Sequence, residues 1–190
     1  MTGAVPGADG RLRCPWGIGT PEYQDYHDQE WGRPVRDDRG LFERLSLEAF
    51  QSGLSWLTIL RKRDAFRSAF DHFDPQTVAG YDDGDRARLL ADSGIVRNRR
   101  KIDATIANAR ALLAQDTSFA DLLWSFAPAR APRPRRLEDV PATTPESVAM
   151  AKELKRRGFA FVGPTTAYAL MQAVGMVDDH LRQCWVNRDN

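Results

Sequence analysis

The chain has few cysteines, histidines and lysines: two, three and four in 190 residues. Two cysteines exclude a disulfide-stapled scaffold, which needs several pairs. No apolar run approaches the roughly 18 residues that a membrane span needs, and the N-terminus lacks the apolar segment of a signal peptide. The sequence therefore predicts a soluble cytoplasmic protein with no membrane partner.

The basic residues are almost all arginine, since only four of 27 are lysine, and they are clustered although the formal net charge is +1. Acidic residues gather elsewhere, in 21–30 and 71–85. Such segregation favours one basic face toward a polyanion, whereas solvated helix surface is the simpler explanation of any single run. The runs are RKRDAFR at 61–67, RNRRK at 97–101, RAPRPRR at 130–136 and KELKRR at 152–157.

Apolar residues recur at helical spacing nearly throughout, as Leu41, Phe42, Leu45 and Phe50 do before Gly53 interrupts the pattern. Strand-like alternation and internal repeats are lacking. We expect an all-α protein of eight to ten short helices, with residues 11–190 as one domain and the small, glycine-rich residues 1–10 as a disordered tail. The 42% hydrophobic content suffices for one well-filled core.

Both cysteines and two of the histidines suggest a metal site. His180 and Cys184 are four residues apart in DDHLRQC, and on a helix they would share one face. Cys14 and His27 lie in a turn-rich N-terminal segment that can wrap around an ion. Two thiolates and two imidazoles suit one structural Zn²⁺, which would join the chain ends. Core packing of a His–Cys pair is the alternative that the spacing leaves open.

Six collinear segments spanning roughly residues 12–185 resemble DNA-3-methyladenine glycosylase I, a family of the helix-hairpin-helix glycosylase superfamily. They are CPW at 14–16, YHDQEWG at 26–32, LFERLSLEAFQSGLSW at 41–56, SGIVRNRRKI at 93–102, LWSF at 123–126 and KRRGFAFVGPTTAYALMQAVGMVDDH at 155–180. The resemblance implies two helical lobes around a base-binding cleft, and it implies the same four zinc ligands: Cys14, His27, His180 and Cys184.

The resemblance also implies a monofunctional enzyme, expected to be a monomer, that hydrolyses the N-glycosidic bond of 3-methyladenine in alkylated double-stranded DNA. Free 3-methyladenine and an abasic site are the products. The family glutamate that recognises the base falls on Glu48, within LEAFQSGLSW. Aromatic walls are expected to stack on a cationic base; their residues are Trp16, Tyr23, Tyr26 and Trp56.

DNA contact is expected from Gly163, Pro164 and Thr165 within GFAFVGPTTA, because Gly163 allows the chain to turn tightly and the helix start that follows offers backbone N–H groups to a phosphate. Phe161 stands where superfamily hairpins usually have glycine. The basic run at 97–101 adds three predicted phosphate contacts: Arg99, Arg100 and Lys101.

Asp178 occupies the position at which many superfamily enzymes have a catalytic aspartate, and this family usually has asparagine. It would either assist catalysis or cap a helix at DHLRQC. Two other functions remain open: a zinc-stapled DNA-binding module without catalysis, and a broader alkylpurine glycosylase that uses Asp178.

Overall fold

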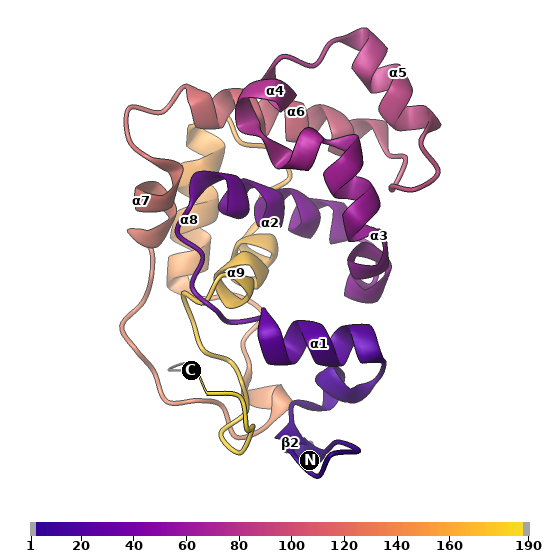
Figure 1. Cartoon of the computed structure of the whole chain (residues 1–190). Helices are drawn as coiled ribbons and strands as arrows, with labels where there is room; N and C mark the ends of the chain where they lie inside the picture. The colour runs from indigo at the N-terminus through magenta and orange to yellow at the C-terminus, as the bar shows by residue number, and fades with distance from the viewer. Residues whose placement is uncertain (1–2, 188–190) are drawn as a thin grey trace.

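A computed structural model describes residues 3–187, and the prediction of a helical protein is confirmed over this range (Figure 1). Residues 3–187 form nine α-helices, three 3-10 helices and one two-stranded pairing, and the longest connection runs from α7 to α8. The elements are β1 (Val5–Pro6), β2 (Leu12–Arg13), η1 (Pro15–Ile18), α1 (Pro21–Gln29), α2 (Asp38–Gln51), α3 (Trp56–Ala69), η2 (Asp71–Phe73), α4 (Pro75–Ala79), α5 (Asp83–Ala91), α6 (Arg99–Leu113), α7 (Phe119–Trp124), η3 (Leu137–Asp139), α8 (Pro145–Arg156) and α9 (Pro164–Ala173).

Helix starts follow local side-chain chemistry. Ser55 and Asp74 accept backbone N–H groups at the starts of α3 and α4, and Thr144 does so at the start of α8, where Pro145 follows. A side-chain oxygen satisfies one of the donors that a helix start leaves unpaired. Serine, aspartate and threonine favour the N-cap position, so these three helix starts follow from the local sequence.

Residues 3–10 correct the prediction of a disordered tail. Val5 and Pro6 pair antiparallel with Arg13 and Leu12. The turn between the strands is fastened by Asp9, which accepts hydrogen bonds from the Arg13 guanidinium at 2.6 and 2.8 Å. The small residues alone gave no sign of this arginine partner, which lies beyond the segment. Residues 1 and 2 lie outside the described residues.

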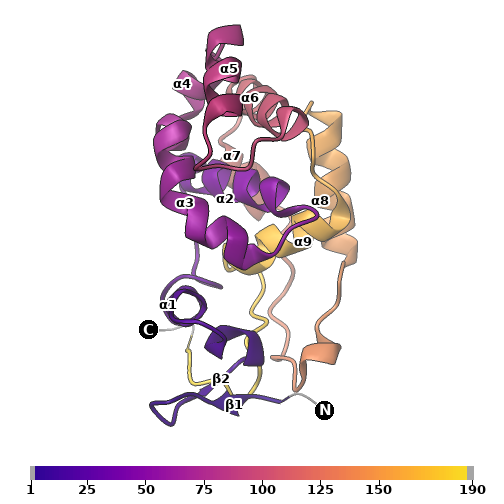
Figure 2. The same cartoon turned by 90° about the vertical axis from the view of Figure 1, so that its right-hand side faces the viewer.

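The large apolar core surrounds α2, which Figure 1 shows at the centre of the molecule and Figure 2 shows from a second side. A second, small cluster joins the chain ends and comprises Cys14, Leu181, Cys184 and Val186. Trp185 donates its backbone N–H to the carbonyl of Leu12 at 2.8 Å. The N-terminal and C-terminal segments are therefore held together by apolar contacts and by a backbone hydrogen bond. The division into two lobes stays a prediction.

The segment DDHLRQC corrects the sequence analysis, because residues 178–184 form turns and not a helix. Asp178 therefore caps no helix. Its carboxylate instead accepts the backbone N–H of His180 at 3.3 Å, two residues on. Side-chain oxygens of aspartate favour such local turns over helix, and spacing alone could not distinguish the two. None of the helices in residues 3–187 is long and apolar enough to cross a membrane.

Gly175 yields a stability prediction. Its φ is +74°, and an added Cβ would lie 2.6 Å from the Gly32 carbonyl oxygen and 2.8 Å from a backbone carbon of Arg33. We expect Gly175→Ala to lower the free energy of unfolding by about 2–5 kcal/mol, because left-handed strain and overlap add together. Gly10, at φ +77° with open space around it, is the matched control, and Gly10→Ala should cost about 1–2 kcal/mol. Equal losses by chemical denaturation would contradict the overlap argument.

Candidate active site and candidate metal centre

A cavity of about 420 Å³ opens among α1, α2, α3 and α9. All five predicted substrate-binding residues line it, although they come from three separate stretches of the sequence. Its walls are formed by Trp16, Tyr23, Tyr26, Trp31, Glu48, Gln51, Trp56, Leu137, Val140, Ala169, Gln172 and Asp179. The structure thus assembles one aromatic site with an acid inside it.

Glu48 is the acid in this cavity, and only 7% of its surface is exposed. It lies on the last turns of α2 between residues that face the core, Leu47 and Phe50. Burial raises the pKa of its carboxyl to about 8. No hydrogen bond or ion pair with another described residue opposes that shift. An unpaired buried carboxyl is costly, so this position is suited to a ligand rather than to stability.

The aromatic walls are held in defined orientations. Trp16 packs edge-on against Tyr23 at a ring distance of 6.0 Å and against Trp31 at 4.9 Å. Tyr26 lies against Trp56 at 5.2 Å. The Tyr23 hydroxyl accepts the backbone N–H of Leu57 at 3.1 Å, which fastens α1 to the start of α3. A flat, electron-rich enclosure of this kind attracts a planar cation.

Four polar or aromatic wall residues were missed by the sequence analysis. Trp31 lines the cavity, and so do Gln51, Gln172 and Asp179. The Asp179 carboxylate accepts hydrogen bonds from the Tyr168 hydroxyl at 2.6 Å and from the Gln172 amide at 2.8 Å. Trp31 and Gln51 lie in segments that carry the family resemblance, but the sequence does not show that their side chains face the cavity. Asp179 reaches the cavity because the chain turns back toward α9 after that helix ends.

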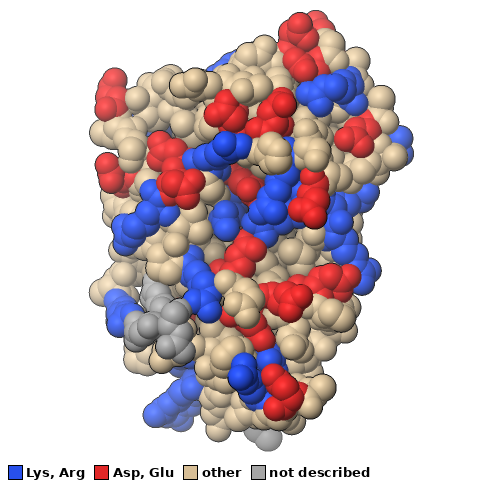
Figure 3. All heavy atoms as spheres, viewed as in Figure 1, with Lys and Arg blue, Asp and Glu red and all other residues tan. Residues whose placement is uncertain are grey.

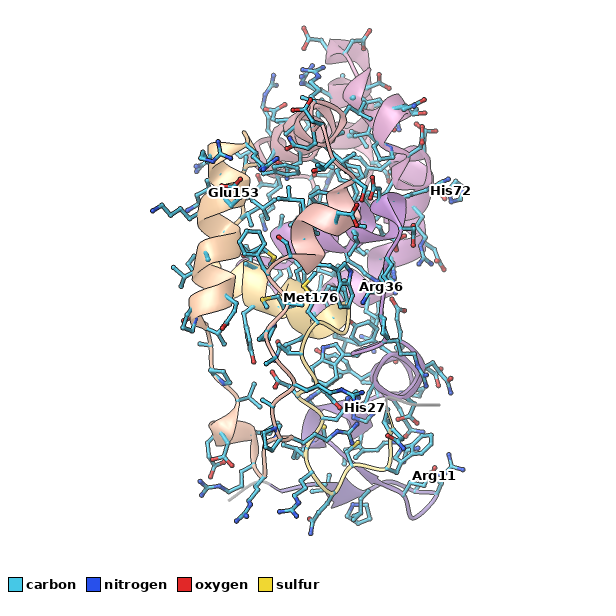
Figure 4. All side chains as sticks on the ribbon, turned by 90° about the vertical axis from the view of Figure 1, so that its left-hand side faces the viewer. Arg11, His27, Arg36, His72, Glu153 and Met176 are labelled. Atoms are coloured by element: carbon cyan, nitrogen blue, oxygen red, sulfur yellow. The ribbon has the colours of Figure 1, made fainter. Side chains whose placement is uncertain are left out.

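Three of the four predicted metal ligands meet at the chain ends. The ligand atoms of Cys14, His27 and Cys184 all lie within 4.8 Å of one another, and the Cys184 sulfur is 3.5 Å from His27 Nε2. In Figure 4, His27 lies between α1 and the C-terminal segment. His180 packs beside this group, with its ring 5.0 Å from that of His27, and its Nε2 is buried without a hydrogen-bond partner.

Both histidines are oriented in the same way. Nδ1 of His27 lies 2.8 Å from the Asp28 carboxylate, and Nδ1 of His180 lies 3.0 Å from the Asp178 carboxylate. Burial acts to raise the pKa of Asp178, but hydrogen bonds from His180 and Arg133 bring it down to about 2. Carboxylates that hold Nδ1 leave Nε2 directed at a metal. The donor set therefore fits a zinc ion.

Two glycines make room for the imidazole rings. A Cβ on Gly17 would lie 2.6 Å from Cγ of His27, and a Cβ on Gly32 would lie 2.9 Å from Cε1 of His180. Gly32 also has a φ of +79°, which favours glycine. The glycines of CPWG and YHDQEWG thus bring the chain close to both rings.

The predicted DNA-contacting residues divide into two groups. Arg99 and Arg100 are exposed at the start of α6. Lys101 is buried and donates to the carbonyls of Phe50 and Ser52 at 2.7 and 2.6 Å, so the structure does not present it to a phosphate. It faces inward because it shares the inner side of α6 with Ile102 and Thr105.

Gly163 also departs from expectation. It precedes Pro164 and Thr165 as the N-cap of α9, but its φ of −94° is open to any residue. The left-handed positions of this connection are Gly158, at φ +90°, and Phe161, at φ +56°. A bulky residue at positive φ is strained. Phe161 therefore has a backbone conformation that glycine adopts at little cost. Acidic and basic side chains are interspersed on the face drawn in Figure 3.

Comparison with known proteins gives the class and then the family. Residues 16–188 match the family model described as methyladenine glycosylase. DNA-3-methyladenine glycosylase of Haemophilus influenzae is 46% identical over 178 residues, which are 90% of this chain and 96% of the relative. DNA-3-methyladenine glycosylase 1 of Escherichia coli is 45% identical over 177 residues, with 90% and 95% covered. The fold and site are those of a DNA glycosylase.

Solved structures agree with this class. A crystal structure of 3-methyladenine DNA glycosylase I superposes with a TM-score of 0.88 at 48% identity, covering 91% of this chain and 98% of that one. A Staphylococcus aureus 3-methyladenine DNA glycosylase I, solved to explain 3-methyladenine recognition, has a TM-score of 0.87 at 35% identity, with 92% and 95% covered. The chain belongs to the methyladenine glycosylase family.

The pKa of Glu48 predicts a stability change. Its carboxyl titrates at about 8 in the folded protein, against 4.5 as the ordinary value. The unfolded chain therefore loses its proton first, and wild-type stability falls as pH rises from about 4.5 to 8. Glu48→Gln, which resembles the protonated acid, should unfold with wild-type Tm at pH 4 and about 10 °C higher at pH 8, because this pKa difference corresponds to about 4 kcal/mol at pH 8. A Tm difference that does not change between these pH values would contradict the raised pKa.

Proposed function

We propose that the protein hydrolyses the N-glycosidic bond of 3-methyladenine in alkylated duplex DNA, releasing the base and leaving an abasic site. Its family, its two curated relatives and a solved relative named as a complex with 3-methyladenine support this activity. The observation that carries the proposal is Glu48, a buried acid without a partner inside an aromatic cavity.

Charge is the basis of selection in this proposal. The damaged base is cationic while it is attached to the sugar, and adenine is neutral. At pH 7, ionising a carboxyl whose pKa is about 8 costs only about 1 kcal/mol. A cation beside it returns more than that through a charge-assisted hydrogen bond, and cation–π attraction adds about 0.5–2 kcal/mol. A neutral base gains neither of these two charge-dependent contributions, so intact adenine binds less well.

The reaction itself needs modest assistance. The base must leave the duplex to reach the cavity, and a lesion that weakens pairing lowers that cost. Once bound, a cationic base is already a good leaving group, so the protein does not have to protonate it. Among the described residues no lysine lines the cavity. Without an amine to form a Schiff base, water is the nucleophile, and the enzyme is monofunctional.

The contacts of Asp178 indicate that it orients His180 and does not take part in catalysis. Its carboxylate bonds His180 and accepts a hydrogen bond from Arg133 at 2.8 Å. It lines a different cavity, beside the proline-rich connector at 128–134, and not the one that contains Glu48. No observation therefore favours the broader alkylpurine activity that a catalytic Asp178 would support.

DNA contact is assigned to the connection between α8 and α9 and to the exposed start of α6. Gly163, Pro164 and Thr165 open α9, whose first N–H groups are free for a phosphate. Arg99 and Arg100 provide positive charge nearby, and the guanidinium of Arg100 lies 5.8 Å from the Phe161 ring centroid. This connection is the counterpart of the helix-hairpin-helix motif that the sequence predicts.

We also propose one structural zinc ion, held by Cys14, His27, His180 and Cys184. The buried Nε2 of His180, which has no partner, and the convergence of the other three ligand atoms support it. Four protein ligands leave no open position for catalysis, so zinc would supply stability by joining the chain ends. The monomeric state and cytoplasmic location stay predictions.

The activity is tested with methylated duplex DNA. Wild type should release 3-methyladenine much faster than 7-methylguanine or hypoxanthine, and Glu48→Gln should lower kcat/KM at least tenfold, because the cation loses its counter-charge. Asp64→Asn is the matched control, since the Asp64 side chain is 99% exposed; it should behave as wild type. DNA binding without base release by wild type would instead identify a binding module.

The metal is tested by elemental analysis of the purified protein. We expect one zinc per chain in wild type and none in Cys184→Ser, with a lower Tm because the chain ends are released. His72→Asn removes the histidine that lies outside the cluster and should retain the zinc. Zinc-free wild type with unchanged stability after Cys184→Ser would contradict the site.

A further inference from the structure

The start of α6 carries a lysine that points into the protein. Lys101 is 6% exposed, and its ammonium group donates to the carbonyls of Phe50 and Ser52 at 2.7 and 2.6 Å. No carboxylate of the described residues lies within ion-pair distance of it. The positive charge of Lys101 is therefore balanced by backbone dipoles alone.

Burying the ammonium group of Lys101 costs free energy, so filling space in the core does not explain why a lysine stands at this position. Removing an ammonium group from water costs several kcal/mol, and burial lowers the pKa of Lys101 accordingly. The carbonyls at the C-terminus of α2 carry partial negative charge, which offsets part of that cost. A methionine of similar length would fill the space without the cost. The ammonium group is thus best explained by the geometry that it imposes on those two carbonyls.

Those carbonyls lie where the loop at the cavity begins: Phe50 is in the last turn of α2, and Ser52 is the first residue after that helix. Gln51 and Trp56 line the cavity on either side of residues 52–55, and Glu48 precedes them by one helical turn. All four intervening residues are exposed. Leu54 is 42% exposed, and Gly53 adopts a φ of +81° with open space around it. Lys101 holds this exposed loop from a separate helix.

The same face of α6 holds the connection between α8 and α9. Asn108, seven residues after Lys101, accepts the backbone N–H of Ala160 at 2.7 Å and donates to its carbonyl at 3.1 Å. Between them, Thr105 donates to the Lys101 carbonyl at 2.9 Å. Residues four and seven apart lie on one helix face. One helix therefore sets the separation between the cavity loop and the proposed DNA-contacting connection.

We propose that Lys101 is a positioning residue of base excision: it holds the 52–55 loop against the DNA from which the base has been extruded. This role rests on the proposed glycosylase activity. The loop must keep its place relative to the connection at 157–163 while both face the duplex. A displacement of about 1 Å in such a loop can lower a rate about a hundredfold. Lys101 touches neither base nor sugar and acts through backbone carbonyls.

Three variants separate this role from general stabilisation. Lys101→Met removes the donors and keeps the length, and Lys101→Arg keeps donors for both carbonyls. Arg110→Met is the matched control: Arg110, on the same helix, donates to the carbonyls of Ala79 and Tyr81 at 2.8 and 3.1 Å, away from the cavity. The measurements are the single-turnover rate of 3-methyladenine release from DNA, the Kd of free 3-methyladenine and Tm.

We expect Lys101→Met to lower the excision rate at least tenfold, to change the Kd of the free base less than threefold, and to be rescued by Lys101→Arg. Arg110→Met should excise at the wild-type rate, and Tm shows how far each variant is destabilised. Lys101→Gln replaces Lys101→Met if the latter does not fold. An excision rate in Lys101→Met no lower than in Arg110→Met would overturn the role of Lys101. Wild type that releases no base would instead overturn the glycosylase activity.

Discussion

The proposed selection of the base depends on a buried carboxyl group that has no partner among the residues the structure describes. Glu48 lies between core residues of α2, and burial raises its pKa to about 8. Only 7% of its surface is exposed, so a charge beside it interacts strongly. The same isolation that makes Glu48 costly in the free protein makes a cationic base its best available counter-charge. In the proposed function, the burial of Glu48 thus both destabilises the free protein and selects a cationic base.

The remaining architecture holds the walls of that cavity in place. Trp16 lies two residues after Cys14, so the cysteine–histidine cluster that joins the chain ends also positions one wall of the cavity. Arg63 pairs with Glu30 at 2.6 Å and with Glu43 at 2.9 Å, tying the end of α1 to α2 and α3. From the other side, α6 holds the loop that separates Glu48 from Trp56. The cysteine–histidine cluster, the ion pairs of Arg63 and helix α6 therefore each position a different part of the cavity that contains Glu48.

Local signals predicted the helices well, and the site only in part. Apolar periodicity and caps such as Ser55 depend on neighbouring residues, so they can be read directly from the chain. Glu48 and its aromatic neighbours were identified through the family resemblance. Lys101 and Asp179 were misassigned or missed because their partners lie far along the chain or beyond a turn. The prediction of a helix at Asp178–Cys184 was wrong, because residues four apart can also come close to each other in a non-helical segment.

The most direct test of this account is the pKa of Glu48 in the free protein. It can be measured by NMR titration of ¹³C-labelled glutamate carboxyl groups, with the resonance assigned by its loss in Glu48→Gln. The account predicts a midpoint near 8, as burial without a partner requires. A midpoint close to the ordinary glutamate value of 4.5 would mean that the carboxylate is already solvated or paired, and would contradict selection of the base by an isolated buried acid.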